Sequence, residues 1–195
     1  MIEVRTAGRE AAVDEDRPEF GLMGRRQTSG LVPARPAAPG PRTRALLELH
    51  QNRGGCRFVA LVGGEFVPGE GHRLAWRVRC WETVAPVPLA GLLPGTLLPG
   101  LPEELDRAAT RGVQAGLESG VLPAGRLVLD RAGHDQESSP LLFAMAAEFL
   151  LHILRARSLG EPAEPLVAAW VATGRLPTSG PARTGPSSCG SAGPG

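Results

Sequence analysis

The sequence contains no lysine and no tyrosine, so all 21 of its basic residues are arginine. The missing residues have AT-rich codons and the abundant alanine, glycine, proline and arginine have GC-rich codons. This bias indicates a GC-rich genome rather than a selected role for arginine. The absence of lysine excludes a G-x-x-x-x-G-K-[ST] phosphate-binding loop, in which the lysine reaches the β- and γ-phosphates. It also excludes a Schiff base formed by a lysine amine.

Cysteine is scarce as well. Cys56, Cys80 and Cys189 are odd in number and widely spaced, which predicts neither a disulfide framework nor a zinc site. The formal net charge of +1 gives no general attraction to nucleic acid or anionic membranes, although a local arginine patch could still bind a polyanion. Residues 1–18 are acidic, unlike a signal peptide, and the longest apolar run, residues 141–154, is too short to span a bilayer. We therefore expect a soluble, cytoplasmic protein with no metal, cofactor or membrane partner.

Glycine and proline divide the chain into three parts. Residues 1–43 are rich in arginine, proline and glycine without a sustained period, and residues 178–195 form a Gly/Ser/Pro tail. Segments of this composition bury too little apolar surface to offset the entropy of ordering. The sequence therefore predicts irregular or disordered N- and C-terminal tails around one folded domain, residues 44–177.

Several short apolar segments predict β-strands. Residues 44–50 and 57–62 flank a Gly-Gly pair, and each could form a strand. Residues 73–84 alternate with period two, which is typical of a half-buried strand. Residues 126–129 and 165–172 complete the predicted set, and the last of these has no polar face.

Two helices are predicted between these strands. Residues 102–119 open with Pro102 and acidic residues and carry a stripe of small residues that would let the helix approach a sheet closely. Residues 140–157 follow Ser139, a preferred N-cap, and are apolar around most of the circumference, as in a buried helix.

The prolines of residues 88–100 predict an apolar loop or edge strand. The order of elements predicts an α+β fold, a β-sheet with two helices packed on one face.

The alternation in residues 73–84 also produces a row of arginines. Arg73, Arg77 and Arg79 share one face of the predicted strand with Trp81. Such a row beside an aromatic ring could bind phosphates and stack a base. A solvated sheet face, with Trp81 covering an edge, explains the same pattern, so both interpretations stay open at this point.

Three separated motifs share their order and spacing with a known family. They are Pro-x-Glu at 102–104 followed by Gly112 and Glu-Ser-Gly-Val-Leu at 118–122, His-Asp-x-Glu-Ser-Ser at 134–139, and Glu-Pro at 164–165. Together they resemble the fourth domain of elongation factor G, domain IV, and of its relatives, the tetracycline-resistance ribosomal protection proteins. The resemblance covers roughly residues 73–177.

The resemblance implies a β-α-β-α-β arrangement with a left-handed crossover, against the usual handedness. It implies that a tip loop, formed by His134, Asp135, Gln136, Glu137 and Ser138, contacts RNA in the ribosome. The glycine-rich loop of the family could match residues 52–55, which adds Arg53 to Arg73, Arg77 and Arg79 as candidate phosphate contacts. The chain departs from the family in having no nucleotide-binding domain, a shorter strand before His134, and none of the lysines that help the family's tip. The implied partners are the ribosome or RNA and a separate translational GTPase, with no DNA.

The tip loop allows other interpretations. A histidine beside carboxylates could hold a metal or act in acid–base catalysis, but the other histidines are isolated in the sequence, and we expect no enzyme activity. The loop could also simply cap the following helix. For the whole chain we expect a non-catalytic module that binds the ribosome or RNA without hydrolysing GTP. The alternatives are a gene remnant, or a diverged protein–protein interaction domain that has lost ribosome binding, which an exposed apolar surface at residues 88–100 would favour.

Overall fold

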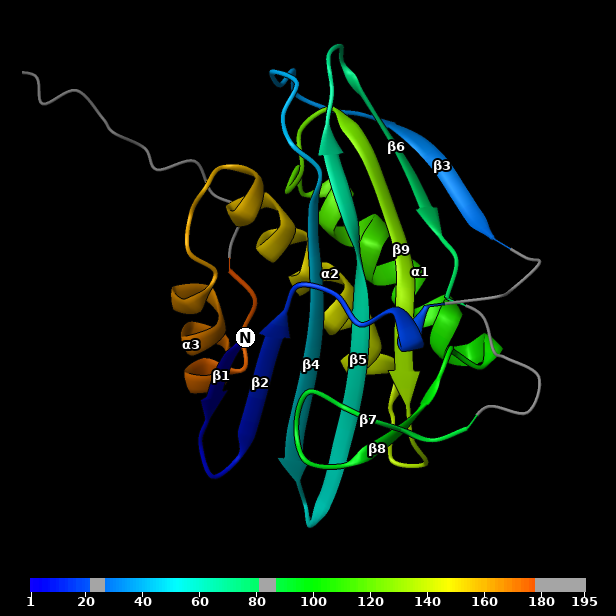
Figure 1. The fold of residues 1–195 in the computed structure, drawn as a ribbon, viewed down its shortest axis with the longest axis vertical. Helices are drawn as coiled ribbons and strands as arrows, with labels where there is room; N and C mark the ends of the chain where they lie inside the picture. The colour runs from blue at the N-terminus through cyan, green and yellow to red at the C-terminus, as the bar shows by residue number, and fades with distance from the viewer. Residues whose placement is uncertain (22–26, 81–86, 178–195) are drawn as a thin grey trace, which may run out of the picture.

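The computed structural model describes residues 1–21, 27–80 and 87–177 and has an α+β fold with a curled, mainly antiparallel sheet (Figure 1). Its strands are β1 (Ile2–Arg5), β2 (Arg9–Asp14), β3 (Thr28–Pro33), β4 (Thr43–Arg53), β5 (Cys56–Pro68), β6 (Arg73–Val78), β7 (Leu89–Ala90), β8 (Thr96–Pro99) and β9 (Gly125–His134). Its helices are the 3-10 helix η1 (Pro18–Phe20) and the α-helices α1 (Glu103–Glu118), α2 (Pro140–Ser158) and α3 (Glu164–Thr173). Within the described residues, no helix is long and apolar enough to cross a membrane.

The main sheet has the strand order β1-β2-β4-β5-β9-β6-β3. Neighbouring strands run antiparallel, except that β6 and β9 run parallel. β8 pairs with β7 and with the end of β9. In the view of Figure 1, α1 and α2 lie behind the sheet, and the β7–β8 hairpin crosses in front of it. We name the side that carries α1 and α2 the helix face, and the opposite side the outer face.

Gly54 and Gly55 make the turn between β4 and β5. Arg53 pairs directly with Cys56, so the turn has two residues, and both glycines have positive φ angles, of 60° and 84°. Positive φ at both central residues is what a type I′ hairpin turn requires. The two strands predicted on either side are confirmed, and both extend beyond their predicted ends because this turn fixes one register over the whole hairpin.

The two predicted helices are confirmed. Ser139 is the N-cap of α2 and accepts a hydrogen bond from the Leu142 N–H at 3.2 Å, whereas Pro102 is the N-cap of α1 rather than its first residue. The small residues of α1 were expected to let this helix approach the sheet, but they let it approach α2 instead. A Cβ atom at Gly112 would overlap the backbone carbonyl of Ala144, so this glycine lets α1 approach α2.

Helix α2 buries a titratable side chain. His152 is buried, and burial together with the neighbouring Arg155 lowers its pKa to about 4. One turn earlier, burial raises the pKa of Glu148. The imidazole of His152 is therefore neutral at pH 7 in the folded protein, as expected for a histidine desolvated against a core.

Apolar side chains are buried on both faces of the sheet. The larger core lies on the helix face and contains side chains of β2, β4, β5, β6, β9 and all three α-helices, with α2 in direct contact with β4 and β5. A smaller core lies on the outer face and consists of Phe20, Leu46, Val59, Leu61 and Leu97. As predicted, residues 88–100 form loops and short edge pairings, and they cover this smaller core (Figure 1).

The predicted last strand is wrong, because these residues form α3. Its first turn contains Glu164 and Pro165, and Gly174 ends it with a left-handed φ of 68°. An apolar run of this length fits a buried strand or a buried helix, and the signals at its two ends decide for the helix. The helix packs on β1 and β2, where Arg9 Nη1 donates a hydrogen bond to the Val171 carbonyl at 2.7 Å.

The expectation of irregular structure throughout residues 1–43 is also wrong, since this segment contains β1, β2 and β3. Ala11 of β2 pairs with Leu49 and Leu31 of β3 with Ala75, so these two strands depend on partners about 40 residues further along the chain, and β1 pairs in turn with β2. Local composition carries little information about such distant pairings. Likewise β9 continues past the predicted strand, because β5 and β8 provide partners as far as His134. The tail predicted at 178–195 lies outside the described residues.

Candidate functional site

The first predicted site, the tip loop, begins with a buried histidine. His134 is the last residue of β9, only 8% exposed, and its Nδ1 donates a hydrogen bond to the Gly100 carbonyl at 2.8 Å. This bond ties the end of β9 to the segment between β8 and α1. His134 is thus a structural residue of the loop, and its side chain is not presented on the surface as expected for an RNA contact.

The rest of the loop is an ordered turn before α2. The Ser138 hydroxyl donates to the Val59 carbonyl at 2.8 Å and accepts from the Asp135 N–H at 3.0 Å. Asp135 Oδ1 accepts from the Glu137 N–H at 2.9 Å, which is a local Asx-type bond. Gln136 and Glu137 project into solvent. The loop therefore has the bonds expected of a helix-capping turn, and it leaves two side chains free for contact.

Across residues 1–21, 27–80 and 87–177, no group of three or more His, Cys, Asp or Glu side chains is placed to hold a metal ion. The bond from Nδ1 to the Gly100 carbonyl fixes the orientation of the His134 ring, and burial leaves little of the ring in contact with solvent.

The second predicted site, the arginine row, has the expected alternation. Along β6, Leu74 and Trp76 are buried on the helix face, whereas Arg73 and Arg77 are exposed on the outer face. Arg79 follows the strand and is exposed too, with its backbone N–H bonded to the Leu129 carbonyl. No ion pair joins these three arginines to another residue in the described part of the chain. Trp81 lies outside the described residues.

The structure does not gather all the predicted residues into one site. Arg53 ends β4 at the hairpin turn, and the tip loop bonds to Val59 near the start of β5, so both lie at one end of the sheet. Arg73 lies at the opposite end, because Leu74 pairs with Gly125 at the start of β9. Arg77 lies between them, beside Val128. The row and the tip loop are therefore separate surfaces.

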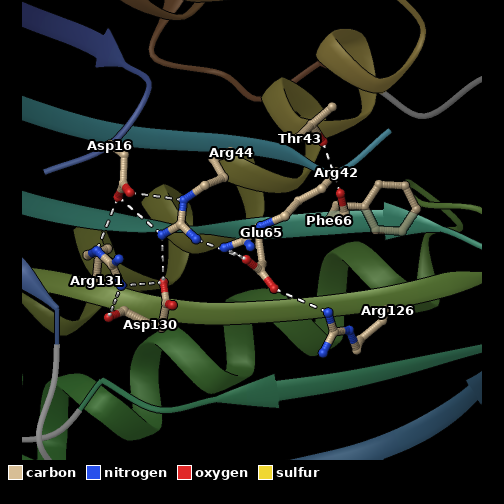
Figure 2. Close-up of polar contacts among 9 residues, drawn as sticks. All are labelled: Asp16, Arg42, Thr43, Arg44, Glu65, Phe66, Arg126, Asp130 and Arg131. Atoms are coloured by element: carbon tan, nitrogen blue, oxygen red, sulfur yellow. Dashed lines mark hydrogen bonds and ion pairs between the residues drawn. The ribbon is translucent and has the colours of Figure 1, made fainter. Parts of the chain in front are cut away.

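Sequence reasoning missed a set of charged side chains on the outer face, shown in Figure 2. We name this set the outer-face charge cluster, and it consists of Asp16, Arg42, Arg44, Glu65, Arg126, Asp130 and Arg131. Its members come from the segment after β2, from the segment before β4 and from β4, β5 and β9 (Figure 2). The sequence signal was the spacing of two in Arg42 and Arg44, but their partners are far away along the chain.

Glu65 is the centre of one half of the cluster. Its carboxylate is 9% exposed and pairs with Arg44 Nη1 at 2.9 Å, with Arg126 Nη2 at 3.5 Å and with Arg42. The side chains of Arg42 and Arg126 extend outward and are 55% and 63% exposed. One buried negative charge therefore holds two largely solvated positive charges at the surface.

The other half of the cluster joins Arg44 and Arg131 to two aspartates. Arg44 Nε and Arg131 Nε lie 3.1 and 3.2 Å from the Asp16 carboxylate, and Arg131 Nη1 lies 2.9 Å from Asp130 Oδ1. Burial raises the pKa of Asp130, although Arg131 and Arg44 oppose this shift. Ion pairs with this exposure contribute up to about 1 kcal/mol each. The main consequence of the cluster is therefore the placement of positive charge, since its four arginines exceed its three carboxylates by one.

A second polar contact missed from the sequence holds the β7–β8 hairpin. Glu48 is almost fully buried, and its Oε1 lies 2.6 Å from His50 Nε2. Its Oε2 accepts hydrogen bonds from the backbone N–H groups of Leu92 and Leu93. His50 is therefore not isolated, and its buried ring contacts the carboxylate that fixes the hairpin over the outer-face core.

No protein-family model, curated protein or solved structure matches the chain. The chemistry of its own surfaces is therefore the basis for a functional conclusion. On the outer face, some arginines have no carboxylate partner among the described residues and others share one carboxylate. Guanidinium groups in either situation can bind phosphate.

Proposed function

We propose that this chain is a non-catalytic RNA-binding module that docks on the ribosome, as the resemblance to domain IV of elongation factor G implies. The arginine row carries the proposal. Arg73, Arg77 and Arg79 are exposed on the outer face, and none is neutralised by a carboxylate of the described residues. Guanidinium groups bind phosphates through paired N–H donors, so an unneutralised row of them is suited to an RNA backbone.

One connection of the chain supports the resemblance, although the last strand of the implied β-α-β-α-β arrangement is instead the helix α3. β6 and β9 are parallel, and α1, which precedes β9, lies behind the sheet in Figure 1. β9 lies to the left of β6 while both run downward in that view. The chain thus leaves β6, passes through the helix behind the sheet and returns one strand to the left. With strands that run downward, this path is the one expected for a left-handed crossover, which is rare in proteins. The proposal assigns GTP hydrolysis, where it is needed, to a separate translational GTPase.

The alternative of a protein–protein interaction domain receives less support. It would be favoured by an exposed apolar surface at residues 88–100. Instead, Leu93 and Leu97 are buried, and Leu97 packs with Leu46, Val59 and Leu61 on the outer face. The apolar character of this segment is thus explained by an internal contact.

Co-sedimentation with 30S and 70S particles tests the proposal. We expect the purified full chain to pellet with ribosomes at about 50 mM salt and to be released at about 200 mM, because phosphate contacts weaken steeply with salt. The triple variant R73Q/R77Q/R79Q should pellet several-fold less at low salt.

The matched control is R107Q. Arg107 is exposed on α1, on the far side of the molecule, so its replacement changes the net charge without touching the outer face. Absence of pelleting by the wild-type chain at low salt would contradict the proposal. So would a reduction in pelleting by R107Q as large as that caused by replacing one arginine of the row.

A further inference from the structure

A shallow hollow lies between two arginines on neighbouring strands. It has a volume of about 90 Å³, and Arg77 of β6 and Arg126 of β9 line it together with Ala75 and Val128. Ala75 pairs with Arg126 and Arg77 with Val128, so the two arginines are diagonal neighbours on the same face. Strand geometry places their Cα atoms about 8 Å apart. Two long arginine side chains that start from Cα atoms this far apart can reach successive phosphates of one extended strand.

Arg126 is oriented towards solvent by a carboxylate that does not neutralise it. Glu65 lies 3.5 Å from Arg126 Nη2, but the same carboxylate also pairs with Arg44 and Arg42 (Figure 2). A single negative charge shared among three guanidinium groups leaves the most exposed of them with donors to spare. Arg77 has no ion-pair partner in the described part of the chain.

An exposed apolar side chain lies beside the hollow, on the strand at the sheet edge. Leu31 of β3 is 53% exposed and pairs with Ala75, which in turn pairs with Arg126, so the three residues form one row across three strands. A free phosphate ion has no apolar surface to pack on Leu31. A nucleic-acid strand has such surface, because the ribose and base of an unstacked nucleotide lie beside the phosphate.

From this arrangement we infer that Arg77 and Arg126 form a binding site for the phosphodiester backbone of single-stranded RNA, with Leu31 and Ala75 as the apolar floor beside it. The inference rests on the proposed function for its choice of RNA. It adds Arg126, which no local pattern in the sequence indicated. It also places the contact on the outer face of β6 and β9 rather than at the tip loop.

Fluorescence anisotropy with labelled oligo(U) and the full chain tests this site. We expect R77Q and R126Q each to weaken binding about 3- to 10-fold and the double variant more. Each should also reduce the slope of log K against log salt by about 0.7, the value for one phosphate contact on a single strand. L31S should weaken binding without changing that slope. All these side chains are exposed, and an unchanged thermal melt verifies folding.

R107Q is again the control, and its affinity and slope should equal those of the wild-type chain. Wild-type affinity and slope in the R77Q/R126Q variant, or no binding of oligo(U) by the wild-type chain at about 50 mM salt, would overturn the inference.

Ribosome pelleting separates this inference from the proposed function. If the wild-type chain binds oligo(U) through the arginine pair but does not pellet with 30S particles, the ribosomal function fails and the RNA site stands. If the wild-type chain pellets and R77Q/R126Q pellets equally well, the ribosomal function stands and the site is wrong.

Discussion

Gly112 of α1 lies directly against the backbone carbonyl of Ala144 in α2, with no room for a Cβ atom between them. G112A should therefore destabilise the protein by about 1–3 kcal/mol through overpacking, despite the better helix propensity of alanine. Urea unfolding measures this change. G8A is the control, because a Cβ at Gly8 meets nothing within 4 Å. Equal stability of G112A and the wild-type chain would show that the two helices can separate without cost.

Glu48 is expected to hold the β7–β8 hairpin in place. Its carboxylate accepts from Leu92 N–H and Leu93 N–H in a buried site, and such charge-assisted bonds are stronger than neutral ones. E48Q should lower the free energy of unfolding by about 1–3 kcal/mol. Hydrogen exchange should show faster exchange of those two amides. E104Q, at an exposed position of α1, should change neither quantity; unaltered amide protection in E48Q would refute the role.

His152 should make stability fall in mild acid. Its pKa is about 4 in the folded protein, against about 6.5 for an unperturbed histidine. Between these two pKa values the unfolded chain binds a proton at this histidine that the folded chain does not. The free energy of unfolding therefore keeps the full contribution of His152 above about pH 6.5 and loses it as the pH falls towards 4. We expect a loss of about 1–2 kcal/mol as the pH falls from about 6.5 towards 4.

Urea titrations at several pH values measure this dependence. H152L should show a flatter pH profile between about pH 6.5 and 4, the window set by the two pKa values. His72 is exposed, so H72L should retain the wild-type profile. A wild-type slope in H152L would mean that other groups dominate the acid sensitivity.

Two variants separate the structural and the RNA-binding interpretations of the tip loop. S138A removes the hydroxyl that bonds to Val59 and Asp135, and it should lower the free energy of unfolding by about 1–2 kcal/mol. Gln136 is exposed, so Q136A should keep the wild-type melting temperature while pelleting several-fold less with ribosomes. If Q136A pellets like the wild-type chain, the loop caps α2 and does not contact RNA through this side chain.

The chain should bind no GTP. Without lysine it cannot form the loop whose lysine contacts the β- and γ-phosphates. Equilibrium dialysis with labelled GTP should show no stoichiometric binding, with a purified translational GTPase as the positive control. Stoichiometric binding by this chain would contradict the expectation directly.

The predicted features that the structure confirms are set by neighbouring residues. Ser139 and Pro140 begin α2, Gly54 and Gly55 form a turn, and the alternation of β6 places Arg73 and Arg77 on one face. Each depends on capping, allowed φ angles or a short period, and these act within a few residues. The sequence alone thus predicted the two longer helices, the two strands that flank the Gly-Gly pair, and the exposed arginine row.

Tertiary structure decided the features that need distant partners. β1 to β3 are strands because β4 and β6 pair with two of them, and α3 is a helix that covers β1 and β2. The outer-face charge cluster joins Asp16 to Arg44 and Arg131, and the hollow joins Arg77 to Arg126, which lie far apart along the chain. Strand pairing fixes these neighbours, and a one-residue change of register would turn every side chain to the other face. The sequence by itself determined that every positive side chain is arginine, and the sheet decided which arginines meet.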